Sequence, residues 1–450
     1  MGKYFGTDGI RGAFGDPLIN PEFAYRFGVA VGHYSIQKSK KSQVTAVIGR
    51  DTRESGQILV NAIISGMNRS GLTVYDLGVV PTPAVAKILL RENADIGVVV
   101  TASHNPSSDN GFKLFSHSGC KLGTKDETYL EELIDQDLDL PEQIPPARAD
   151  LIDGAAAYIE QIRGLLKKDS TADWKIVLDL ANGATCGTSP EVLSHGGGEL
   201  ILIGKEPNGK NINAGVGSEH PMQLGETVRK HNATLGIAHD GDGDRIVVCD
   251  ELGEPIDGDI LLGLLALYAM EKGQLAGQTL VATLQSNLGL DRAVNEAGGR
   301  VLRADIGDRN VAQLMRESGA NLGGESSGHI IFSDYATTGD GLLAAIKLIE
   351  LMLYYRKPLS ELKGRLALFP QETANLKVEK KRPLEALTHL NAAIRRAEGD
   401  LGTRGRVLVR YSGTEPKLRI LVEAENSAQT STTLMQIINA AKMDLKVIEG

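Results

Sequence analysis

Aromatic residues, cysteines and long apolar runs are all scarce in this chain of 450 residues. Aromatic side chains make up only 4% of it, which leaves few surfaces on which nucleic-acid bases could stack. The net charge of −9 also argues against nucleic acid and anionic membranes as partners. The most apolar segment, residues 260–270, is too short to cross a bilayer and is expected to form a buried helix. These features favour a soluble globular protein.

The three cysteines, Cys120, Cys186 and Cys249, are widely spaced and odd in number. Their spacing matches no metal site, and an odd number does not suit a disulfide framework. The first residues also lack the apolar segment of a secretory leader. We therefore expect reduced thiols and a cytoplasmic location.

Glycine, by contrast, is frequent, with 52 residues, which is typical of α/β proteins with many tight turns. Three stretches of the chain repeat one order of apolar strands and helical patterns. Each ends in a run Ala-x-(Ile/Leu)-Gly, beginning at Ala94, Ala233 and Ala320, and then enters a polar loop. Short apolar runs that alternate with helices predict βαβ units, whose ligands lie beyond the carboxyl ends of the parallel strands. We therefore expect the three loops to face one cleft.

The length of the chain predicts several domains rather than one core. Linker-like segments occur at residues 140–146 and at Phe369-Pro370. After the second linker we expect a strand at 375–378, a helix that includes Leu384 to Ile394, strands at 407–409 and 418–422, and a last helix. The expected fold class is α/β: three similar domains with mixed, mainly parallel sheets, plus a smaller C-terminal α+β domain, around a central cleft. The expected domains are 1–150, 151–256, 257–370 and 371–450.

The first polar loop contains Ser103, directly after three consecutive valines of an expected buried strand. A serine at such a place is usually a capping hydroxyl, and His104 beside it is more often structural than catalytic. The sequence has no Gly-x-Ser-x-Gly nucleophile elbow. Ser103 becomes a candidate nucleophile because Lys113 is nearby in the chain and because an acidic loop follows the next repeat.

In that acidic loop Asp240, Asp242 and Asp244 alternate with glycine. In an extended segment such side chains face one way, and three adjacent carboxylates repel one another unless a cation lies between them. Mg²⁺ suits them, since it takes a few carboxylates together with phosphate oxygens. An EF-hand does not fit, because its sixth position requires glycine and is Arg245 here. The pattern predicts a catalytic magnesium site with one ion.

The remaining loops suit a phosphorylated sugar. Glu325, Ser327 and His329 offer donors and acceptors for vicinal hydroxyls, although a plain glycine-rich connection would look similar. A second, basic loop groups guanidinium groups, hydroxyls and a glycine: Arg410, Ser412, Gly413, Thr414 and Arg419. Guanidinium binds phosphate bidentately, and the loop lacks the spacing of a Walker motif. The glycine-containing segment around Arg11 precedes no βαβ unit, which argues against a dinucleotide site. We expect Arg11 to reach the transferring phosphate.

These motifs resemble those of the α-D-phosphohexomutase superfamily over the whole chain and in the same order. Residues 3–12 and 207–213 are similar to stretches that mark the branch acting on glucosamine phosphates. The chain departs from that branch at Ser326, where Gln is common. The resemblance implies four domains around a central cleft and an isomerase that interconverts glucosamine 6-phosphate and glucosamine 1-phosphate.

The resemblance also implies a role for each motif. Ser103 would carry the phosphoryl group, and the three aspartates would bind Mg²⁺ together with it. Arg11, His104, Lys113 and Arg245 match positions around the phosphoserine. Glu325, Ser327 and His329 would recognise the sugar, and the Arg410–Arg419 loop would hold the phosphate that is not transferred. A hexosamine 1,6-bisphosphate would be the intermediate and activator.

Three alternatives remain open from the sequence. A phosphomannomutase or phosphoglucomutase would share every catalytic loop. A metal-dependent phosphatase would not need the second phosphate-binding loop, and a phosphosugar-binding regulator would need neither nucleophile nor metal site. The sequence does not fix the phosphorylation state of Ser103 or the oligomeric state, and it is compatible with a homodimer.

Overall fold

The computed structural model describes residues 2–136, 141–412 and 415–448. The chain divides into two compact units. The larger comprises residues 1–285 and 297–365, and the smaller comprises residues 286–296 and 366–450. Within the described ranges, every helix is too short or too polar to cross a membrane.

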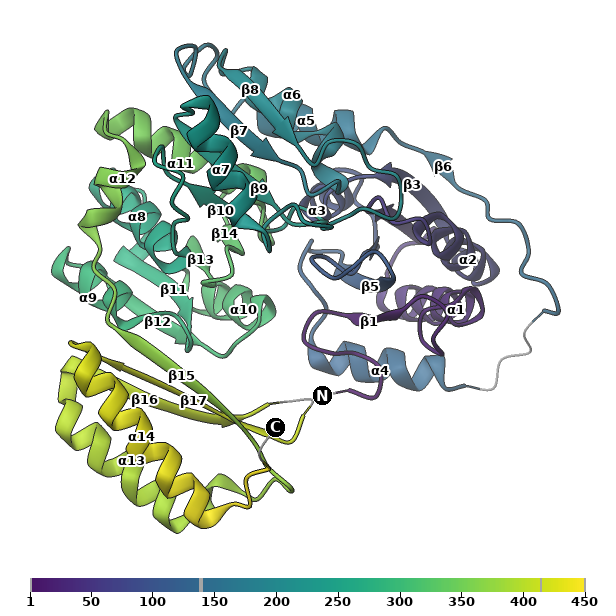
Figure 1. Ribbon diagram of the computed structural model, residues 1–450. Helices are drawn as coiled ribbons and strands as arrows, with labels where there is room; N and C mark the ends of the chain where they lie inside the picture. The colour runs from purple at the N-terminus through teal and green to yellow at the C-terminus, as the bar shows by residue number, and fades with distance from the viewer. Residues whose placement is uncertain (1, 137–140, 413–414, 449–450) are drawn as a thin grey trace. The chain divides into compact units, whose positions relative to one another are not determined.

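The larger unit contains three β-sheets with one shared strand order (Figure 1). The first sheet runs β1 (Ile10–Ala13), β5 (Asp109–Ser116), β4 (Ile96–Val100), β2 (Thr45–Arg50), β3 (Thr73–Val79) and β6 (Asp150–Leu151). The second runs β10 (Ile246–Cys249), β9 (Leu235–His239), β7 (Lys175–Asp179) and β8 (Glu199–Ile203). The third runs β14 (Ile330–Phe332), β13 (Leu322–Gly324), β11 (Thr279–Thr283) and β12 (Arg300–Ala304).

Each sheet contains three parallel strands and one antiparallel strand that pairs with the third of them, and the first sheet adds β6, parallel to β3, and β1, antiparallel to β5. The returning strands are β5, β10 and β14, and their partners are β4, β9 and β13. The loop between each partner and its returning strand is one of the polar loops predicted above, containing Ser103, Asp240 or Glu325. The predicted threefold repeat and the mixed, mainly parallel sheets are confirmed.

Helices connect and cover these sheets. Those of the larger unit are α1 (Pro21–Lys38), α2 (Gly56–Arg69), α3 (Thr82–Arg91), α4 (Thr124–Ile134), α5 (Gly154–Arg163), α6 (Ser189–Ser194), α7 (Pro221–His231), α8 (Gly258–Glu271), α10 (Asp308–Ser318), α11 (Gly341–Tyr355) and α12 (Leu359–Leu362). The expected buried helix at 260–270 is α8, and all of its leucines are buried. Asn20 caps α1 by accepting a hydrogen bond from the amide of Phe23, and Pro21 follows at the first helical position.

The repeated Ala-x-(Ile/Leu)-Gly run has a packing reason. Its glycines, Gly97, Gly236 and Gly323, lie on β4, β9 and β13. A Cβ atom on any of them would come within 2.6 to 2.7 Å of a side chain on the helix that directly precedes the strand, namely Leu89, Val228 and Met315. Glycine therefore allows each helix to pack closely on the strand that leads into a polar loop.

The smaller unit is an α+β layer pair (Figure 1). Its antiparallel sheet has the order β15 (Gln371–Lys377), β17 (Lys417–Ala424) and β16 (Gly405–Tyr411), and α13 (Thr388–Leu401) packs with α14 (Ser427–Asp444) on one face. Helix α9 (Leu288–Glu296) also belongs to this unit, and the preceding Asn287 exchanges two hydrogen bonds with the main chain of Phe369. The helix expected from Leu384 begins only at Thr388, because Leu384–Ala386 forms a 3-10 turn directly after Pro383.

Candidate active site

Ser103 lies at the carboxyl end of β4 and faces the acidic loop of the second sheet. Its hydroxyl donates a hydrogen bond of 2.6 Å to Oδ2 of Asp240. The residue is fully buried and has a φ of 53°, a left-handed conformation that is uncommon for serine. Such a conformation persists only when the surroundings hold it in place, and it is often found at functional sites.

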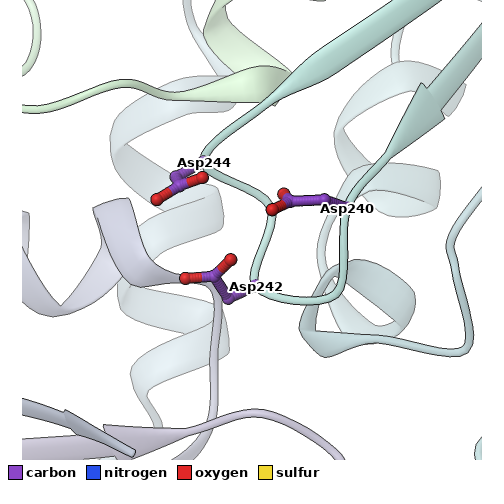
Figure 2. Close-up of side chains that lie close together, drawn as sticks. All are labelled: Asp240, Asp242 and Asp244. Carbon is purple, nitrogen blue, oxygen red and sulfur yellow. The ribbon is translucent and has the colours of Figure 1, made fainter. Parts of the chain in front are cut away.

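The three aspartates converge as predicted, although the backbone reason differs (Figure 2). Carboxylate oxygens of Asp240, Asp242 and Asp244 all lie within 4.8 Å of one another, and the side chains are buried. The segment is a turn rather than an extended strand: the amide of Gly243 donates to the carbonyl of Asp240 at 3.1 Å, and Gly243 has a φ of +70°. The turn folds the three carboxylates toward one point.

These carboxylates fit a hard cation. Oδ1 of Asp242 and Oδ1 of Asp244 are buried and have no hydrogen-bond partner among the described residues. Burial and the neighbouring charges of Asp242 and Asp244 raise the pKa of Asp240 to about 8. Unpartnered oxygens of closely spaced buried carboxylates are stabilised by a divalent cation, so these three residues suit a metal ion.

Lys113, on β5, supplies a fixed positive charge beside this loop. Its Nζ lies 2.7 Å from Oδ2 of Asp242 and 2.9 Å from Oδ2 of Asp244, and the side chain is almost fully buried. Burial opposes the charge, but the two carboxylates outweigh it and hold the pKa of Lys113 well above its usual range. Lys113 therefore stays protonated and acts through its charge.

Two arginines expected near the phosphoryl group also lie here. Arg11, on β1, forms an ion pair with Asp8, and Arg245 directly follows the metal loop, with its Nε 3.9 Å from Oδ1 of Asp244. The Nε atoms of both arginines are buried without a hydrogen-bond partner in the part of the chain that the structure describes. His104 lies beside Ser103, with its Nδ1 3.4 Å from Oγ of Ser103. The predicted catalytic residues thus come together from two sheets.

The predicted sugar loop lies between β13 and β14, and its three residues have different surroundings. Ser327 is exposed, and Glu325 is half-buried and accepts a hydrogen bond of 3.0 Å from the amide of Gly307. His329 is buried, and its Nε2 accepts a hydrogen bond of 3.0 Å from the amide of Gly339, so Nδ1 carries the proton. That Nδ1 faces Oδ1 of Asp244 at 3.7 Å. His329 therefore connects the sugar loop to the metal loop.

The smaller unit carries the basic loop. Arg410 on β16 lies directly opposite Arg419 on β17, so two like charges face each other across the strand pair. Burial and the charge of Arg419 lower the pKa of Arg410. Nη2 of Arg419 lies 3.5 Å from the hydroxyl of Ser412. A bound anion would relieve this repulsion. The predicted residues Gly413 and Thr414 lie outside the described residues.

Several residues of the site were not predicted from the sequence. Thr82 donates a hydrogen bond of 2.5 Å to Oδ2 of Asp242. Asp8 forms ion pairs with Arg11 and Lys121, and Lys121 lies 2.5 Å from Oδ2 of Asp308 at the start of α10. These are single residues far apart in the chain, and no spacing in the sequence marks them. Together they connect the N-terminal segment, the first sheet and the third sheet.

Family models place the whole chain in one family. Four of them match in sequence order, all described as phosphoglucomutase/phosphomannomutase: alpha/beta/alpha domain I at residues 2–140, domain II at 156–253, domain III at 257–369 and the C-terminal domain at 374–440. The order of the matches is the order of the polar loops described above.

Individual proteins agree with these matches. A phosphoglucosamine mutase of Pelobacter propionicus is 42% identical over 99% of both chains. The crystal structure of a phosphoglucomutase/phosphomannomutase family protein from Burkholderia thailandensis superposes with a TM-score of 0.82 at 26% identity and covers 99% of this chain and 100% of its own. The N-acetylphosphoglucosamine mutase of Aspergillus fumigatus, crystallised with GlcNAc-6P and magnesium, shares the fold at 16% identity, with a TM-score of 0.67 over 99% of this chain and 96% of its own. The chain therefore belongs to the phosphoglucosamine mutases of the phosphoglucomutase/phosphomannomutase family.

Proposed function

We propose that this enzyme, an isomerase, interconverts glucosamine 6-phosphate and glucosamine 1-phosphate through a phosphorylated Ser103. The observation that carries the proposal is the contact between the Ser103 hydroxyl and Asp240, inside a cluster of three carboxylates and the Lys113 ammonium. A phosphoryl group on Ser103 would lie between a metal site and fixed cations. Phosphoryl transfer needs this arrangement, because it depends on positioning and charge neutralisation.

The reaction would proceed in two transfers. In the first, the bond between phosphorus and Oγ of Ser103 breaks while a bond forms from phosphorus to the free hydroxyl oxygen of the sugar phosphate. The sugar hydroxyl loses one proton and Ser103 takes up one, so the step is balanced. The resulting hexosamine 1,6-bisphosphate turns round in the site, and the other phosphoryl group returns to Ser103 in the second transfer.

One magnesium ion per chain would be held by Asp240, Asp242, Asp244 and the phosphoryl group of Ser103. Bound Mg²⁺ would supply charge neutralisation for the transferring oxygens. The side chains of Arg11 and Arg245 would add hydrogen bonds to the same oxygens, which their buried and unpartnered Nε atoms support. Lys113 would hold Asp242 and Asp244 in place for the metal and contribute positive charge.

Substrate recognition would use both remaining loops. Glu325, Ser327 and His329 would contact the sugar hydroxyls, and Arg410, Ser412, Gly413, Thr414 and Arg419 would hold the phosphate that is not being transferred. The facing pair of Arg410 and Arg419 supports this anchoring role. The anchor must accept the phosphate at either end of the sugar, because the bisphosphate presents both.

A preference for an amino sugar is supported by the charges next to the sugar loop. Glu325 lies close to Asp308: the amide of Gly307, the residue before Asp308, donates to Glu325. Burial is the main cause that raises the pKa of Glu325; His329 opposes the shift, and repulsion from the charge of Asp308 adds to it. A glucosamine phosphate carries an ammonium group at C2 that would reduce this repulsion, whereas glucose and mannose phosphates do not.

The other expectations stay predictions. We propose that the domains span 1–150, 151–256, 257–370 and 371–450, which the family matches at 2–140, 156–253, 257–369 and 374–440 support. The cytoplasmic location rests on the three unpaired cysteines and the phosphosugar substrate. A homodimer is compatible with all of these features, and neither nucleic acid nor membrane is expected as a partner.

The test is ³¹P NMR of the purified protein with Mg²⁺ and a trace of sugar bisphosphate. Glucosamine 6-phosphate, glucose 6-phosphate and mannose 6-phosphate are supplied in parallel. We expect a 1-phosphate signal that grows fastest from glucosamine 6-phosphate. Faster turnover of glucose or mannose phosphate would assign the enzyme to a neighbouring activity, and release of free phosphate would indicate a phosphatase instead.

A further inference from the structure

The loop that carries Ser103 is held by an arginine that the mechanism does not use. Arg53 follows β2, and its side chain is fully buried. All five of its N–H groups have acceptors. Nε donates to Oδ2 of Asp51 at 2.8 Å, and the remaining four donate to main-chain carbonyls of the Ser103 loop, those of Ser103, Asn105, Pro106 and Asp109. A complete set of guanidinium bonds to one loop fixes the path of its backbone.

Asn213, in the part of the chain that forms the second sheet, donates to two of the same carbonyls. Nδ2 of Asn213 donates to the carbonyl of Ser103 at 2.9 Å and to the carbonyl of Asn105 at 3.0 Å. Asn213 closes the segment 207–213, which follows β8. The same segment contacts the neighbourhood of Arg53, since the amide of Glu54 donates to the carbonyl of Gly209 at 3.0 Å. Arg53, from the first sheet's part of the chain, and Asn213, from the second sheet's part, therefore donate to the same two carbonyls, those of Ser103 and Asn105.

The metal loop packs on the same carbonyl group. A Cβ atom on Gly241 would lie 2.5 Å from the carbonyl oxygen of Ser103 and 2.9 Å from Nδ2 of Asn213. The Ser103 carbonyl is thus a point where the nucleophile loop, the metal loop and the two donors converge. The left-handed φ of Ser103 directs its Oγ toward Asp240, and this conformation needs outside support.

We infer that Arg53 and Asn213 act together as positioning residues, which clamp the carbonyls of Ser103 and Asn105 and so align the Ser103 oxygen with the metal loop. The inference rests on the proposed role of Ser103 as phosphoryl carrier. The side-chain hydrogen bonds of Arg53 and Asn213 described above go to Asp51 and to main-chain carbonyls of the loop, and neither residue belongs to the proposed sugar or phosphate sites, so the clamp acts on the rate of phosphoryl transfer and not on substrate affinity. Small displacements of a reacting atom are costly in rate.

The first test uses Asn213→Gly, because Asn213 has a φ of 59° and glycine keeps that backbone conformation while removing both donors. We expect kcat to fall about 10- to 100-fold, as is typical when an outer residue that orients a reacting group is lost, with KM for glucosamine 6-phosphate unchanged. The ³¹P signal of phosphorylated Ser103 should shift. The matched control is Lys210→Ala in the same segment, since the exposed Lys210 side chain forms an ion pair at the surface with the exposed Glu54.

Arg53 is tested by Arg53→Lys rather than by alanine, because an unpaired Asp51 in the core would threaten folding. Lysine keeps the charge for Asp51 but cannot reach all four carbonyls, so we expect the same loss of kcat with an unchanged KM. A folded Asn213→Gly enzyme with wild-type kcat and an unshifted ³¹P signal would overturn the inference. The inference would also be overturned if the loss of activity in these variants were fully accounted for by the fraction of protein that is unfolded.

Failure of the clamp and failure of the proposed function give different results. The wild-type protein is first incubated with a hexose 1,6-bisphosphate, and phosphate on Ser103 is measured by mass spectrometry. If wild type incorporates none, the proposed function is wrong. If wild type incorporates phosphate and the Asn213→Gly variant transfers it at the same rate, only the clamp is wrong.

Discussion

The hydroxyl of Ser103 donates a 2.6 Å hydrogen bond to Asp240, a residue 137 positions away in the chain. Each residue lies in the loop that joins the third parallel strand of its sheet to the returning antiparallel strand. The same topological position in two repeats thus supplies the Ser103 hydroxyl and the aspartate cluster. A repeated fold can build one active site in this way, by directing equivalent loops toward each other.

Replacement of Ser103 by alanine is expected to abolish phosphoryl incorporation and nearly all mutase turnover while the fold stays intact. Only one hydroxyl is removed, with its hydrogen bond to Asp240 and its 3.4 Å contact with His104, so circular dichroism and the melting midpoint should change little. Incorporation is measured by mass spectrometry after incubation with a hexose 1,6-bisphosphate. Ser108→Ala is the matched control, because Ser108 lies in the same loop with an exposed hydroxyl bonded to Asp109. Mutase activity retained in Ser103→Ala would contradict the scheme.

Removal of divalent metal is expected to stop turnover, and added Mg²⁺ is expected to restore it. Among the described residues, the buried Oδ1 atoms of Asp242 and Asp244 have no hydrogen-bond partner, and a divalent cation would offset the repulsion that remains beside Lys113. An Asp242→Asn variant should need about 10- to 100-fold more Mg²⁺ for half-maximal activity, since it loses one charged ligand. Isothermal titration calorimetry measures the change in affinity directly. Full activity in the presence of a strong chelator would contradict the metal role.

Most of the active-site loops were predictable from the sequence because each follows a strand that is short, apolar and buried. Residues 96–100, for instance, are buried without exception, and the polar Ser103 loop begins directly after them. The convergence of the three aspartates was predictable from their spacing, because three carboxylates so close together in the chain repel one another and favour a shared cation. The turn that gathers them was not, since alternation with glycine is equally compatible with an extended strand.

The rest could not be predicted because it depends on long-range pairing. β5 mixes polar and apolar residues, so its pairing with β4, which brings Lys113 to the metal loop, has no local signal. Asp8, Lys121 and Asp308 form an ion-pair chain across residues far apart in sequence. Residues 286–296 join the smaller unit through Asn287 and Phe369, which a linear reading of domains does not reveal.

Substitution of Arg419 by alanine is expected to weaken substrate binding more than catalysis. One charged hydrogen bond to phosphate contributes roughly 1.5–3 kcal/mol, so KM should rise about 10- to 100-fold with a smaller change in kcat. Steady-state kinetics with glucosamine 6-phosphate gives both values. Lys417→Ala on the same strand serves as control, because Lys417 already pairs with Glu415. An unchanged KM in Arg419→Ala would contradict the anchoring role.

The N-terminal segment is expected to detach at low pH. Glu131 on α4 accepts hydrogen bonds from the amides of Lys3, Tyr4 and Phe5. Burial alone would raise the pKa of Glu131, but these bonds lower it below the ordinary value of 4.5. Because the folded-state pKa is depressed, the ionised carboxylate stabilises the docked segment fully at pH values above the ordinary pKa of 4.5. This stabilisation is lost as the pH falls through the lower, folded-state pKa.

Hydrogen exchange of residues 3–5 tests this dependence. Their amides should be protected at neutral pH and should exchange freely once the pH falls below the folded-state pKa of Glu131. Glu131→Gln should show the unprotected state at neutral pH as well, because the neutral amide oxygen is a weaker acceptor for three donors. Glu132→Gln on the same helix is the control. Protection that persists at low pH would show that Glu131 does not hold the segment.

The amino-sugar preference is expected to depend on Asp308. The neutral Asp308→Asn side chain keeps its size but removes one of the two negative charges beside the sugar loop, so an ammonium group at C2 would lose a favourable interaction. We expect kcat/KM for glucosamine 6-phosphate to fall about tenfold relative to that for glucose 6-phosphate, which corresponds to about 1.4 kcal/mol. Comparing two substrates in one variant cancels any effect of the lost pairing with Lys121, since that effect would act on both. If this ratio of kcat/KM values equals that of wild type, Asp308 does not contribute to recognition of the C2 amino group.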